Sequence, residues 1–381
     1  MLDKKKQKRV CHISTVHHLS DVRVFYRECR SLVKAGYEVH LVISADEAGV
    51  RQGVRIHPIR VAKNRLLRML FTPWSAMISA LKTKASIYHY HDPELLPMGF
   101  VLRWVFGKKV VFDVHESVPR QIMSKPYLPR FTRRAISFCY KLIERVFITG
   151  QTMIVANKNS VSDYSSHTYL VQNYPLADEQ MVAAASDGKQ RNGIPLLVYV
   201  GRVSRIRGAV VCIELAAGLA RRGHDFRVQL IGPYSETFGT ELKAKIEELH
   251  LQDKVTLTGH MDWPEAMKLT SQAAIGLCLL LPEPNYTACL ATKIIEYMMV
   301  GTPVLASDFD VWRPYVEGES TGMMANPTSI DDVVNVCEQM LGNPDELANM
   351  GRRGMEAVRT RYNWNREFEV LLECYENLLR K

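Results

Sequence analysis

The sequence predicts an α/β protein made of two doubly wound, Rossmann-like domains that face a cleft. Three observations lead to this prediction. Short apolar segments rich in Val, Ile, Leu and Tyr alternate with longer stretches of helical period, which is typical of parallel βαβ units. The alternation lapses once, after Asn173-Tyr174-Pro175, and then starts again. A chain of 381 residues is long enough for two such domains, each with its own core.

The first half contains seven candidate strands, most of them separated by helical stretches. The stretch Val22–Ala35 is a clear example: its apolar residues recur on one side, whereas Arg23, Arg27 and Arg30 take the other side, and Gly36 ends the helix. The expected strands are Arg9–Thr15, Glu38–Ser44, Val54–Val61, Ser86–His91, Val110–His115, Met153–Ala156 and Tyr169–Gln172.

The polar residues after Pro175 predict a linker, and a second βα series follows it. We therefore expect an acceptor-side domain over 1–175, a linker over 176–193, a nucleotide-binding domain over 194–362, and a last helix over 363–381 that packs back on the first domain. The expected elements of the second series are the strands Leu196–Val200, Val228–Ile231, Val255–Thr258, Ile275–Leu281 and Val304–Ala306, and the helices Ala209–Arg222, Glu241–Leu249, Pro264–Ala273, Thr292–Val300, Ile330–Leu341, Pro344–Arg359 and Trp364–Leu379.

The charge distribution and the cysteine content indicate in which compartment the protein works. Residues 1–180 contain 28 Lys and Arg against 14 Asp and Glu, although the whole chain has a net charge of only +9. A basic half is compatible with nucleic acid, an anionic membrane leaflet or an anionic substrate. The eight cysteines include no CxxC pair, and the sequence shows neither a signal peptide nor an uncharged apolar stretch of membrane-spanning length. We expect a protein of the cytoplasm or of the inner membrane surface.

Two segments of the second half predict an anion-binding site. The first is the strand-to-helix turn from Gly201 to Gly208, in which Arg202 and Arg207 accompany a glycine that allows close backbone approach. The second begins at Asn285, Tyr286 and Thr287 and continues into a helix whose first turn contains Lys293 and Glu296. A spacing of three places the last two on one face, where the amine can meet an anion and the carboxylate can accept hydroxyls. A solvated ion pair is the alternative.

The motif Gly201-Arg-x4-Arg207-Gly208, followed later by Lys293-Ile-Ile-Glu296-Tyr-Met-x2-Gly301-Thr-Pro-Val, resembles that of GT-B glycosyltransferases of family 4. The resemblance implies a retaining, metal-independent transfer of a sugar from a UDP- or GDP-linked donor, with no further cofactor. It also implies that Arg202 and Arg207 neutralise the donor diphosphate and that Glu296 accepts the ribose hydroxyls. Fixed positive charge would stabilise the charge that develops on the leaving diphosphate.

The first half supports the resemblance through three segments: Asp21-Val-Arg23-Val-Phe-Tyr-Arg-Glu28, Tyr88-His-Tyr-His91-Asp92-Pro-Glu94 and Val111-Phe-Asp-Val-His115-Glu116. They are similar to the family's acceptor-side patterns, which implies that His115 is a catalytic histidine hydrogen-bonded to the donor sugar. The expected acceptor-side residues are His17, Asp21, Arg23, His91 and Asp92. The run from His89 to Asp92 contains metal-ligating residue types, but no third ligand cluster is near it in the sequence, so no metal is expected.

One position departs from the family pattern. The family's Glu-x7-Glu motif places a glutamate eight residues before Glu296, where this chain has Ala288. We expect backbone contacts from Asn285, Tyr286 and Thr287 to replace the missing carboxylate, and the donor sugar stays open.

The expected acceptor is a lipid-linked glycan of cell-surface polysaccharide assembly. The stretch 64–82 mixes apolar, aromatic and basic residues, and Lys4–Lys8, Arg130, Arg133 and Arg134 add positive charge that suits an anionic membrane surface. A core face with solvated basic residues is the alternative reading of this stretch. The rival functions are a nucleotide-sugar epimerase of the same fold and a nucleic-acid-binding protein. We expect no nucleic-acid partner, because no RNA-binding motif accompanies the basic residues.

Overall fold

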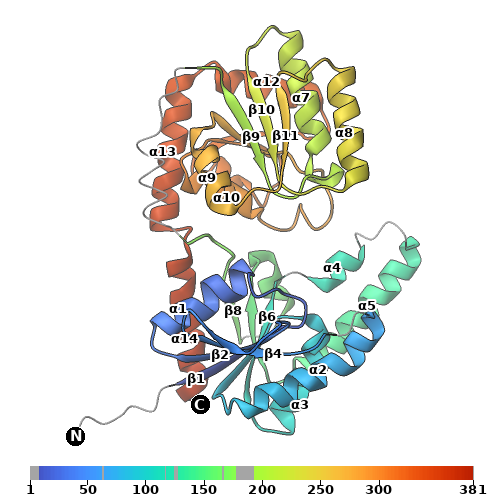
Figure 1. The fold of residues 1–381 in the computed structure, drawn as a ribbon, viewed down its shortest axis with the longest axis vertical. Coiled ribbons are helices and arrows are strands. Elements are labelled where there is room, and N and C mark those ends of the chain that lie inside the picture. The colour runs from blue at the N-terminus through green and yellow to red at the C-terminus, as the bar shows by residue number, and fades with distance from the viewer. Residues whose placement is uncertain are drawn as a thin grey trace, which may run out of the picture. The chain divides into compact units, whose positions relative to one another are not determined.

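The computed structural model describes residues 8–61, 64–115, 117–123, 128–164, 167–176 and 193–380. The chain forms two compact units. The first unit contains the residues up to Asn173 together with those from Trp364 onward, and the second contains Tyr174–Asn363 (Figure 1). Most of the predicted linker, residues 177–192, lies outside the described residues, as do Lys4 to Gln7 and Glu116.

The first unit is built on an eight-stranded sheet of order β3-β4-β2-β1-β5-β6-β7-β8. All neighbours are parallel except β3 and β4, which form a short antiparallel pair that the sequence analysis missed. The seven predicted strands are present, most of them one to three residues shorter than expected. The strands are β1 (Arg9–Ile13), β2 (Glu38–Ile43), β3 (Gly49–Arg51), β4 (Val54–Pro58), β5 (Ile87–Tyr90), β6 (Lys109–Val114), β7 (Thr152–Val155) and β8 (Thr168–Leu170).

Helices cover both faces of this sheet. Alternate strand residues such as Cys11 and Tyr88 join one apolar core with residues of α2, α3 and α5, and the intervening His12 and His89 point to the other face, toward Tyr375 of α14. The helical elements of the unit are η1 (Val22–Cys29), α1 (Arg30–Lys34), α2 (Arg65–Lys82), η2 (Pro93–Leu95), α3 (Leu96–Trp104), α4 (Val118–Met123), α5 (Arg130–Phe147), η3 (Lys158–Asp163) and α14 (Trp364–Arg380).

The first helix differs from the prediction in its winding. Residues of η1 form a π-helix, and the amide of Tyr26 donates to the carbonyl of Asp21, five residues earlier, at 3.3 Å. This winding turns Arg23 and Arg27 into the protein, where both are buried, so the expectation that they face solvent was wrong. A π-helix brings residues five apart to the same side, and Arg23 and Glu28 therefore point into the same buried region.

The second unit has a fully parallel six-stranded sheet of order β11-β10-β9-β12-β13-β14. One core lies against α7, α8 and α12, and a second core lies against α9, α10, α11 and α13. Its strands are β9 (Leu196–Val200), β10 (Arg227–Ile231), β11 (Val255–Gly259), β12 (Ile275–Cys278), β13 (Val304–Ser307) and β14 (Gly322–Ala325). Its helices are η4 (Arg205–Arg207), α7 (Ala209–Arg221), α8 (Glu236–Glu248), α9 (Trp263–Gln272), α10 (Thr292–Met299), α11 (Arg313–Val316), α12 (Ile330–Leu341) and α13 (Pro344–Thr360).

Two boundaries and one strand of the second unit differ from the prediction. Strand β12 ends at Cys278 rather than Leu281, α8 begins at Glu236 because Ser235 caps it, and β14 was missed. In each sheet the strand order reverses once, between β1 and β5 in the first unit and between β9 and β12 in the second. In open α/β sheets ligands bind outside the carboxyl ends of the strands at such a reversal. The two reversals therefore define where the candidate site residues should lie.

Candidate active site

The turn after β9 is shaped by its glycines. Gly201 has φ +129°, and a Cβ there would lie 3.6 Å from the amine of Lys293. Gly208 has φ +83°, and a Cβ there would lie 1.8 Å from the carbonyl oxygen of Leu279. Both positions require glycine, because other residues rarely adopt these angles and Gly208 leaves no room for a side chain. We call residues 201–208 the basic loop.

Lys293, in the first turn of α10, is the central side chain of this region. It is only 7% exposed, its amine lies 3.8 Å from the centre of the Tyr199 ring, and it has no hydrogen-bond partner among the described residues. The solvated ion pair with Glu296 that the spacing allows is therefore not formed as a hydrogen bond. Burial, with a smaller effect of the nearby charge of Arg207, lowers the pKa of Lys293 to about 8, and Cys278 acts in the opposite direction.

Two arginines of the basic loop add positive charge. Arg207 Nε donates to the hydroxyl of Tyr286 at 3.3 Å, which joins the basic loop to the segment after β12. Arg202 is exposed, and its carbonyl oxygen accepts a hydrogen bond from Tyr199 at 2.7 Å. Two of the predicted diphosphate-binding residues, Arg207 and Lys293, are thus close enough to influence each other's charge, with Arg202 on the same loop.

The segment after β12 does not offer all the groups that the sequence suggested. The amides of Tyr286 and Thr287 both donate to the carbonyl oxygen of Glu283, at 2.9 and 3.0 Å, and so are used by the turn itself. The backbone contacts expected from Asn285, Tyr286 and Thr287 in place of the carboxylate missing at Ala288 stay a prediction, and these two amides are not free to make them in this turn. The side chain of Asn285 accepts a weak hydrogen bond from Cys289 at 3.8 Å.

Glu296 lies one turn after Lys293 on α10 and is partly exposed. Its Oε1 accepts a hydrogen bond from the indole of Trp263 at 3.3 Å. The indole orients the carboxylate but occupies only part of its hydrogen-bonding capacity, because a carboxylate has about four acceptor positions. Glu296 can accept further hydroxyl groups beside the cations.

The first unit has a hollow of about 380 Å³ at the carboxyl ends of β5 and β6. We call it the acceptor-side hollow. Four of the residues predicted for this side line it: His17, His91, Asp92 and His115. These residues follow β1, β5 and β6, so the chain positions around the strand reversal bring them together.

His17 and Asp92 form an ion pair at one edge of the hollow. His17 Nδ1 lies 3.2 Å from Asp92 Oδ1, and Asp92 Oδ2 also accepts hydrogen bonds from the Ser14 hydroxyl and the Thr15 amide. Burial opposes ionisation of both side chains, but their mutual attraction outweighs it, so the pKa of His17 is raised and that of Asp92 is lowered. Both shifts favour the charged forms of the two side chains.

His91, Asp113 and His115 form a second group in the hollow. Asp113 Oδ2 lies 3.2 Å from His91 Nδ1 and 3.1 Å from His115 Nε2. Burial lowers the pKa of His91 to about 4, despite the opposing effect of Asp113. His91 is therefore neutral at physiological pH, and Asp113 orients both imidazole rings.

Two of the predicted acceptor-side residues do not line the hollow. Asp21 caps η1, because its carboxylate accepts a hydrogen bond from the Val24 amide at 2.8 Å. Arg23 is buried and donates two hydrogen bonds to Asp113, both 2.9 Å long, and two to the carbonyl oxygen of Val171. Their contacts stabilise the fold around the hollow, and their expected role on the acceptor side stays a prediction.

Glu144 of α5 also lines the acceptor-side hollow and was missed in the sequence. Burial raises the pKa of its carboxyl group to about 7, although Tyr164 donates a hydrogen bond to it at 3.4 Å. An acid with a pKa near neutrality can exchange protons at physiological pH. In the sequence, Glu144 lies among Lys141, Arg145 and apolar residues and so is typical of a solvated helix position.

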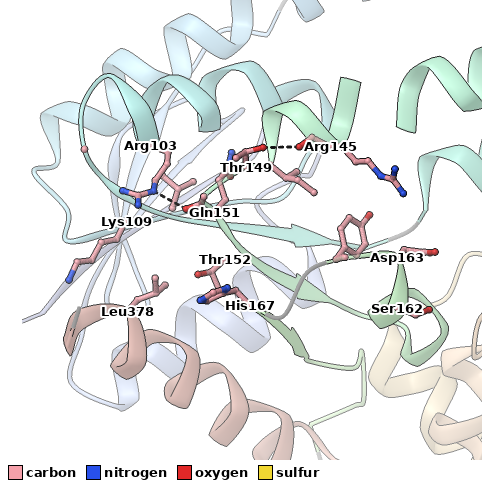
Figure 2. Close-up of a pocket in the computed structure, with 15 residues that line it drawn as sticks. Arg103, Lys109, Arg145, Thr149, Gln151, Thr152, Ser162, Asp163, His167 and Leu378 are labelled. Atoms are coloured by element: carbon pink, nitrogen blue, oxygen red, sulfur yellow. Dashed lines mark hydrogen bonds between the residues drawn. The ribbon is translucent and has the colours of Figure 1, made fainter. Parts of the chain in front are cut away.

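A larger hollow, of about 900 Å³, lies at the opposite edge of the same sheet (Figure 2). Its lining includes Lys109 and Thr152, the first residues of β6 and β7, and Arg103, whose Nε donates to the carbonyl oxygen of Gly150 at 2.8 Å. Ligands of doubly wound sheets bind at the carboxyl ends. Size alone therefore does not make this hollow the active site.

Family models match both parts of the chain. Residues 185–357 match glycosyl transferases group 1, and residues 22–176 match Glycosyltransferase Family 4. Two Rossmann-like units, the second with a group of cationic side chains at its strand reversal, agree with the GT-B glycosyltransferases as the class of enzyme. The chain belongs to the group 1, family 4 glycosyltransferases of this fold.

Curated relatives include several transferases of small molecules. An alpha-D-kanosaminyltransferase of Streptomyces kanamyceticus is 26% identical over 204 residues, which are 53% of this chain and 51% of the relative. A D-inositol 3-phosphate glycosyltransferase of Nocardia farcinica is 30% identical over 192 residues, 49% of this chain and 41% of the relative. The chain thus spans about half the length of these curated relatives.

Solved structures share the fold at low identity. Sucrose-phosphate synthase from Thermosynechococcus elongatus matches with a TM-score of 0.78 and 17% identity, over 98% of this chain and 100% of that one. HepE from Anabaena in complex with UDP matches with a TM-score of 0.71 and 14% identity, over 97% and 100%.

Proposed function

We propose that this glycosyltransferase moves a sugar from a nucleotide-diphosphate sugar to a lipid-linked glycan acceptor, on the cytoplasmic face of an anionic membrane. The observation that carries the proposal is the buried amine of Lys293, which has no hydrogen-bond partner among the described residues. A buried ammonium group without an acceptor costs folding free energy. A diphosphate at the basic loop would supply that acceptor and would also meet Arg207 and Arg202.

The donor assignment has further support from the second unit. Glu296 is positioned by Trp263 one helical turn from Lys293, where a carboxylate is the acceptor type that ribose hydroxyls require. HepE from Anabaena was crystallised with UDP and with UDP-glucose, which favours a UDP-linked donor over a GDP-linked one. The sugar itself stays open, because Ala288 stands where the family has a carboxylate.

We propose that the transfer proceeds with retention and without a metal ion on the diphosphate. Retention follows from the family resemblance. Three cationic side chains, Arg202, Arg207 and Lys293, would supply the positive charge that a metal ion supplies in other transferases. On the first unit, the acceptor-side hollow presents His115, which is suited to hydrogen-bonding the donor sugar, and the His17–Asp92 pair for acceptor hydroxyls.

The membrane proposal depends on α5. This helix of 18 residues exposes apolar side chains that a solvated helix would bury, among them Phe131 at 84% and Phe138 at 70% exposure. Basic residues alternate with them along the helix: Arg130, Arg133, Arg134, Lys141 and Arg145. Apolar side chains that enter a bilayer beside basic ones that meet anionic headgroups are typical of interfacial helices.

Helix α2 and the turn after α3 extend the apolar surface. The sequence left two interpretations of the apolar side chains in the stretch 64–82: a face that packs in the core or a face that contacts a membrane. In the structure Phe71 and Trp74 of this stretch are exposed. Trp104, Val105 and Phe106 are exposed as well. So many large apolar side chains on one unit favour an interaction surface over solvent. Among the described residues, no helix combines the length and apolarity needed to cross a bilayer.

The donor proposal is tested by thermal shift with UDP, GDP, ADP and dTDP, each with and without EDTA. We expect one diphosphate to raise the melting temperature equally in both conditions, and the Lys293→Met variant to lose the shift. The matched control is Arg205→Ala, because Arg205 of the same loop pairs with Glu241. Absence of any shift, or an unchanged shift in Lys293→Met, would remove the diphosphate assignment.

Product analysis separates the transferase from the epimerase and tests retention. With UDP-sugar and a lipid-linked acceptor, we expect a new glycosidic bond with the donor's anomeric configuration by NMR. Conversion of the donor sugar without any acceptor product would favour the epimerase instead. Inversion would leave the transferase proposal in place but overturn retention.

The membrane proposal is tested by co-sedimentation with vesicles of anionic or purely zwitterionic lipid. We expect binding to anionic vesicles that weakens with salt and falls at least tenfold when Phe131 and Phe138 are both changed to Ser. The control changes exposed Trp263 of the second unit to Ser, which should leave binding unaltered. Equal binding of all variants would contradict this surface.

A further inference from the structure

The core of the first unit contains a group of four polar side chains with an unusual arrangement. His12 lies on β1, His89 is its register partner on β5, His91 directly follows β5, and Glu28 comes from η1. All four are buried, with at most 2% exposure. We call these four residues the buried histidine cluster. Polar groups this deep in a sheet protein need partners to offset the loss of water.

The ligand-type atoms of the cluster converge on one carboxylate oxygen. Glu28 Oε2 lies 3.7 Å from His12 Nδ1, 3.9 Å from His89 Nδ1 and 3.8 Å from His91 Nε2. His12 Nδ1 and His91 Nε2 are 3.0 Å apart. Three imidazole nitrogens and one carboxylate oxygen thus enclose a single small space in the core.

The hydrogen bonding around this space is incomplete. Neither carboxylate oxygen of Glu28 has a hydrogen-bond partner among the described residues, although Arg23 Nε lies 3.2 Å from Oε1. Unsatisfied groups at this depth call for a specific explanation, such as a bound ion.

We propose that the buried histidine cluster is a structural transition-metal site, with one nitrogen from each of His12, His89 and His91 and one oxygen of Glu28 as ligands. In tetrahedral zinc sites with bonds of about 2.0–2.1 Å, neighbouring ligand atoms lie about 3.3 Å apart. The distances of 3.7 to 3.9 Å from Glu28 Oε2 and of 3.0 Å between His12 and His91 are close to this value, and all four ligand atoms lie within 4.8 Å of one another. Three imidazoles and one carboxylate favour Zn²⁺ over Mg²⁺ or Ca²⁺.

The residues around the cluster are those that a metal site requires. The second ring nitrogen of His91 meets Asp113, which Arg23 holds from the other side, and this gives a carboxylate–histidine–metal arrangement. The second ring nitrogen of His12 lies 3.2 Å from the hydroxyl of Tyr375. That hydroxyl is also 2.7 Å from His89 Nδ1. If His89 Nδ1 bound the ion, the Tyr375 hydroxyl would still have His12 Nε2 as a hydrogen-bond partner.

The ion would have a different task from the cations at the diphosphate. It would lie inside the first unit and touch no donor group, so it is compatible with transfer that needs no metal on the diphosphate. Its effect on the acceptor-side hollow would pass through His91, whose Nδ1 side meets Asp113 and His115. His12, Glu28 and His89 are absent from the lining of that hollow.

Metal content of the purified full chain, with any histidine tag removed, tests the proposal. We expect about one zinc ion per chain, measured by inductively coupled plasma mass spectrometry. After removal of the zinc with a strong chelator, added Co²⁺ should give the intense visible absorption of a four-coordinate ion, and Zn²⁺ should displace it. Zn²⁺ should also raise the melting temperature of the stripped protein.

Two variants locate the site. His89→Gln should weaken metal binding at least tenfold, because it removes a ligand outside the acceptor-side hollow. His57→Gln is the matched control, since His57 pairs with His40 on the neighbouring strands of the same sheet at 2.8 Å. It should retain the full metal content.

The wild-type cobalt spectrum decides the question even if His89→Gln does not fold. A stripped protein that shows neither the four-coordinate spectrum nor a thermal shift with Zn²⁺ would overturn the proposal. Retention of the ion by folded His89→Gln, or its loss from His57→Gln, would also overturn it.

Discussion

A buried cation lies at the carboxyl edge of each sheet, and the two differ in their hydrogen bonding. In the first unit Arg23 makes four hydrogen bonds, two to Asp113 and two to the carbonyl of Val171. In the second unit the amine of Lys293 has no hydrogen-bond partner among the described residues, and burial lowers its pKa to about 8. A cation that is satisfied by its own fold positions other groups, whereas a cation that the fold leaves unsatisfied is available to a ligand.

The largest effect on stability is expected from Arg23. Changing Arg23 to Met leaves Asp113 and Glu28 buried without their cation, which should lower the free energy of unfolding by about 3–5 kcal/mol. Urea unfolding monitored by circular dichroism measures this change. Lys34→Met, at the exposed end of α1, is the control and should change stability by less than about 0.5 kcal/mol. A loss as small as that of the control would contradict the structural role of Arg23.

Lys293 should give the reverse pattern. Lys293→Met keeps the length of the side chain and removes a buried charge, so the unliganded protein should be at least as stable as the wild type. Its kcat/KM should nevertheless fall about 100- to 1000-fold, equivalent to about 2–4 kcal/mol of lost charge stabilisation at the leaving diphosphate. Steady-state kinetics together with urea unfolding separate the two effects. A variant that loses stability and activity together would make Lys293 a structural residue.

The sequence predicted the fold class and the order of the elements well, because strand alternation and helical period depend on local residue patterns. It also predicted the turn from Gly201 to Gly208 as a place of close backbone approach. The φ angles and close contacts at both positions require glycine. Residues His17, His91 and Asp92 were grouped correctly in space, since parallel strands bring their carboxyl ends together.

The remaining features depend on contacts between distant segments. No local residue pattern predicts that η1 winds as a π-helix, so the burial of Arg23 and Arg27 was not predicted. His12 and Glu28 join His89 and His91 only through the packing of η1 on the sheet, which is why the sequence around His89 did not predict the buried histidine cluster. The use of the Tyr286 amide in its own turn is likewise visible only in three dimensions.

The pH dependence of donor binding also tests the contrast between Arg23 and Lys293. The folded pKa of Lys293, about 8, lies below its ordinary value of 10.5. Unliganded protein therefore loses this proton as pH rises through 8, while the unfolded chain keeps it, so the contribution of Lys293 to stability becomes more favourable between pH 8 and 10.5. Diphosphate binding has the opposite trend, because the anion needs the charged amine.

Calorimetry of the preferred nucleoside diphosphate tests this sign. We expect a constant affinity between pH 6.5 and about 7.5 and a decrease of about tenfold by about pH 9. Lys293→Met should bind weakly, with little change over the same range. An equal decrease in this variant would mean that another group titrates.

The smallest expected effect concerns Glu144, the acid of the acceptor-side hollow. Its folded pKa of about 7 exceeds the ordinary 4.5, so the folded protein holds this proton longer than the unfolded chain does. Glu144 therefore lowers stability progressively as pH rises from 4.5 to 7, and the penalty is complete above pH 7. Glu144→Gln should be more stable than the wild type at pH 8, by about 1 kcal/mol, and nearly equal to it at pH 4.5.

The same variant tests whether Glu144 takes part in the reaction. If the carboxylate receives a proton in the hollow, the wild-type pH profile of kcat/KM should bend near pH 7, and the Gln variant should lose that bend along with several-fold of its activity. Glu94→Gln is the matched control, because Glu94 pairs with Arg68 and does not line the hollow. A stability change without any change in the pH profile would make Glu144 a buried acid of the fold. A lost bend would instead make Glu144 a proton-exchanging group of the acceptor-side hollow.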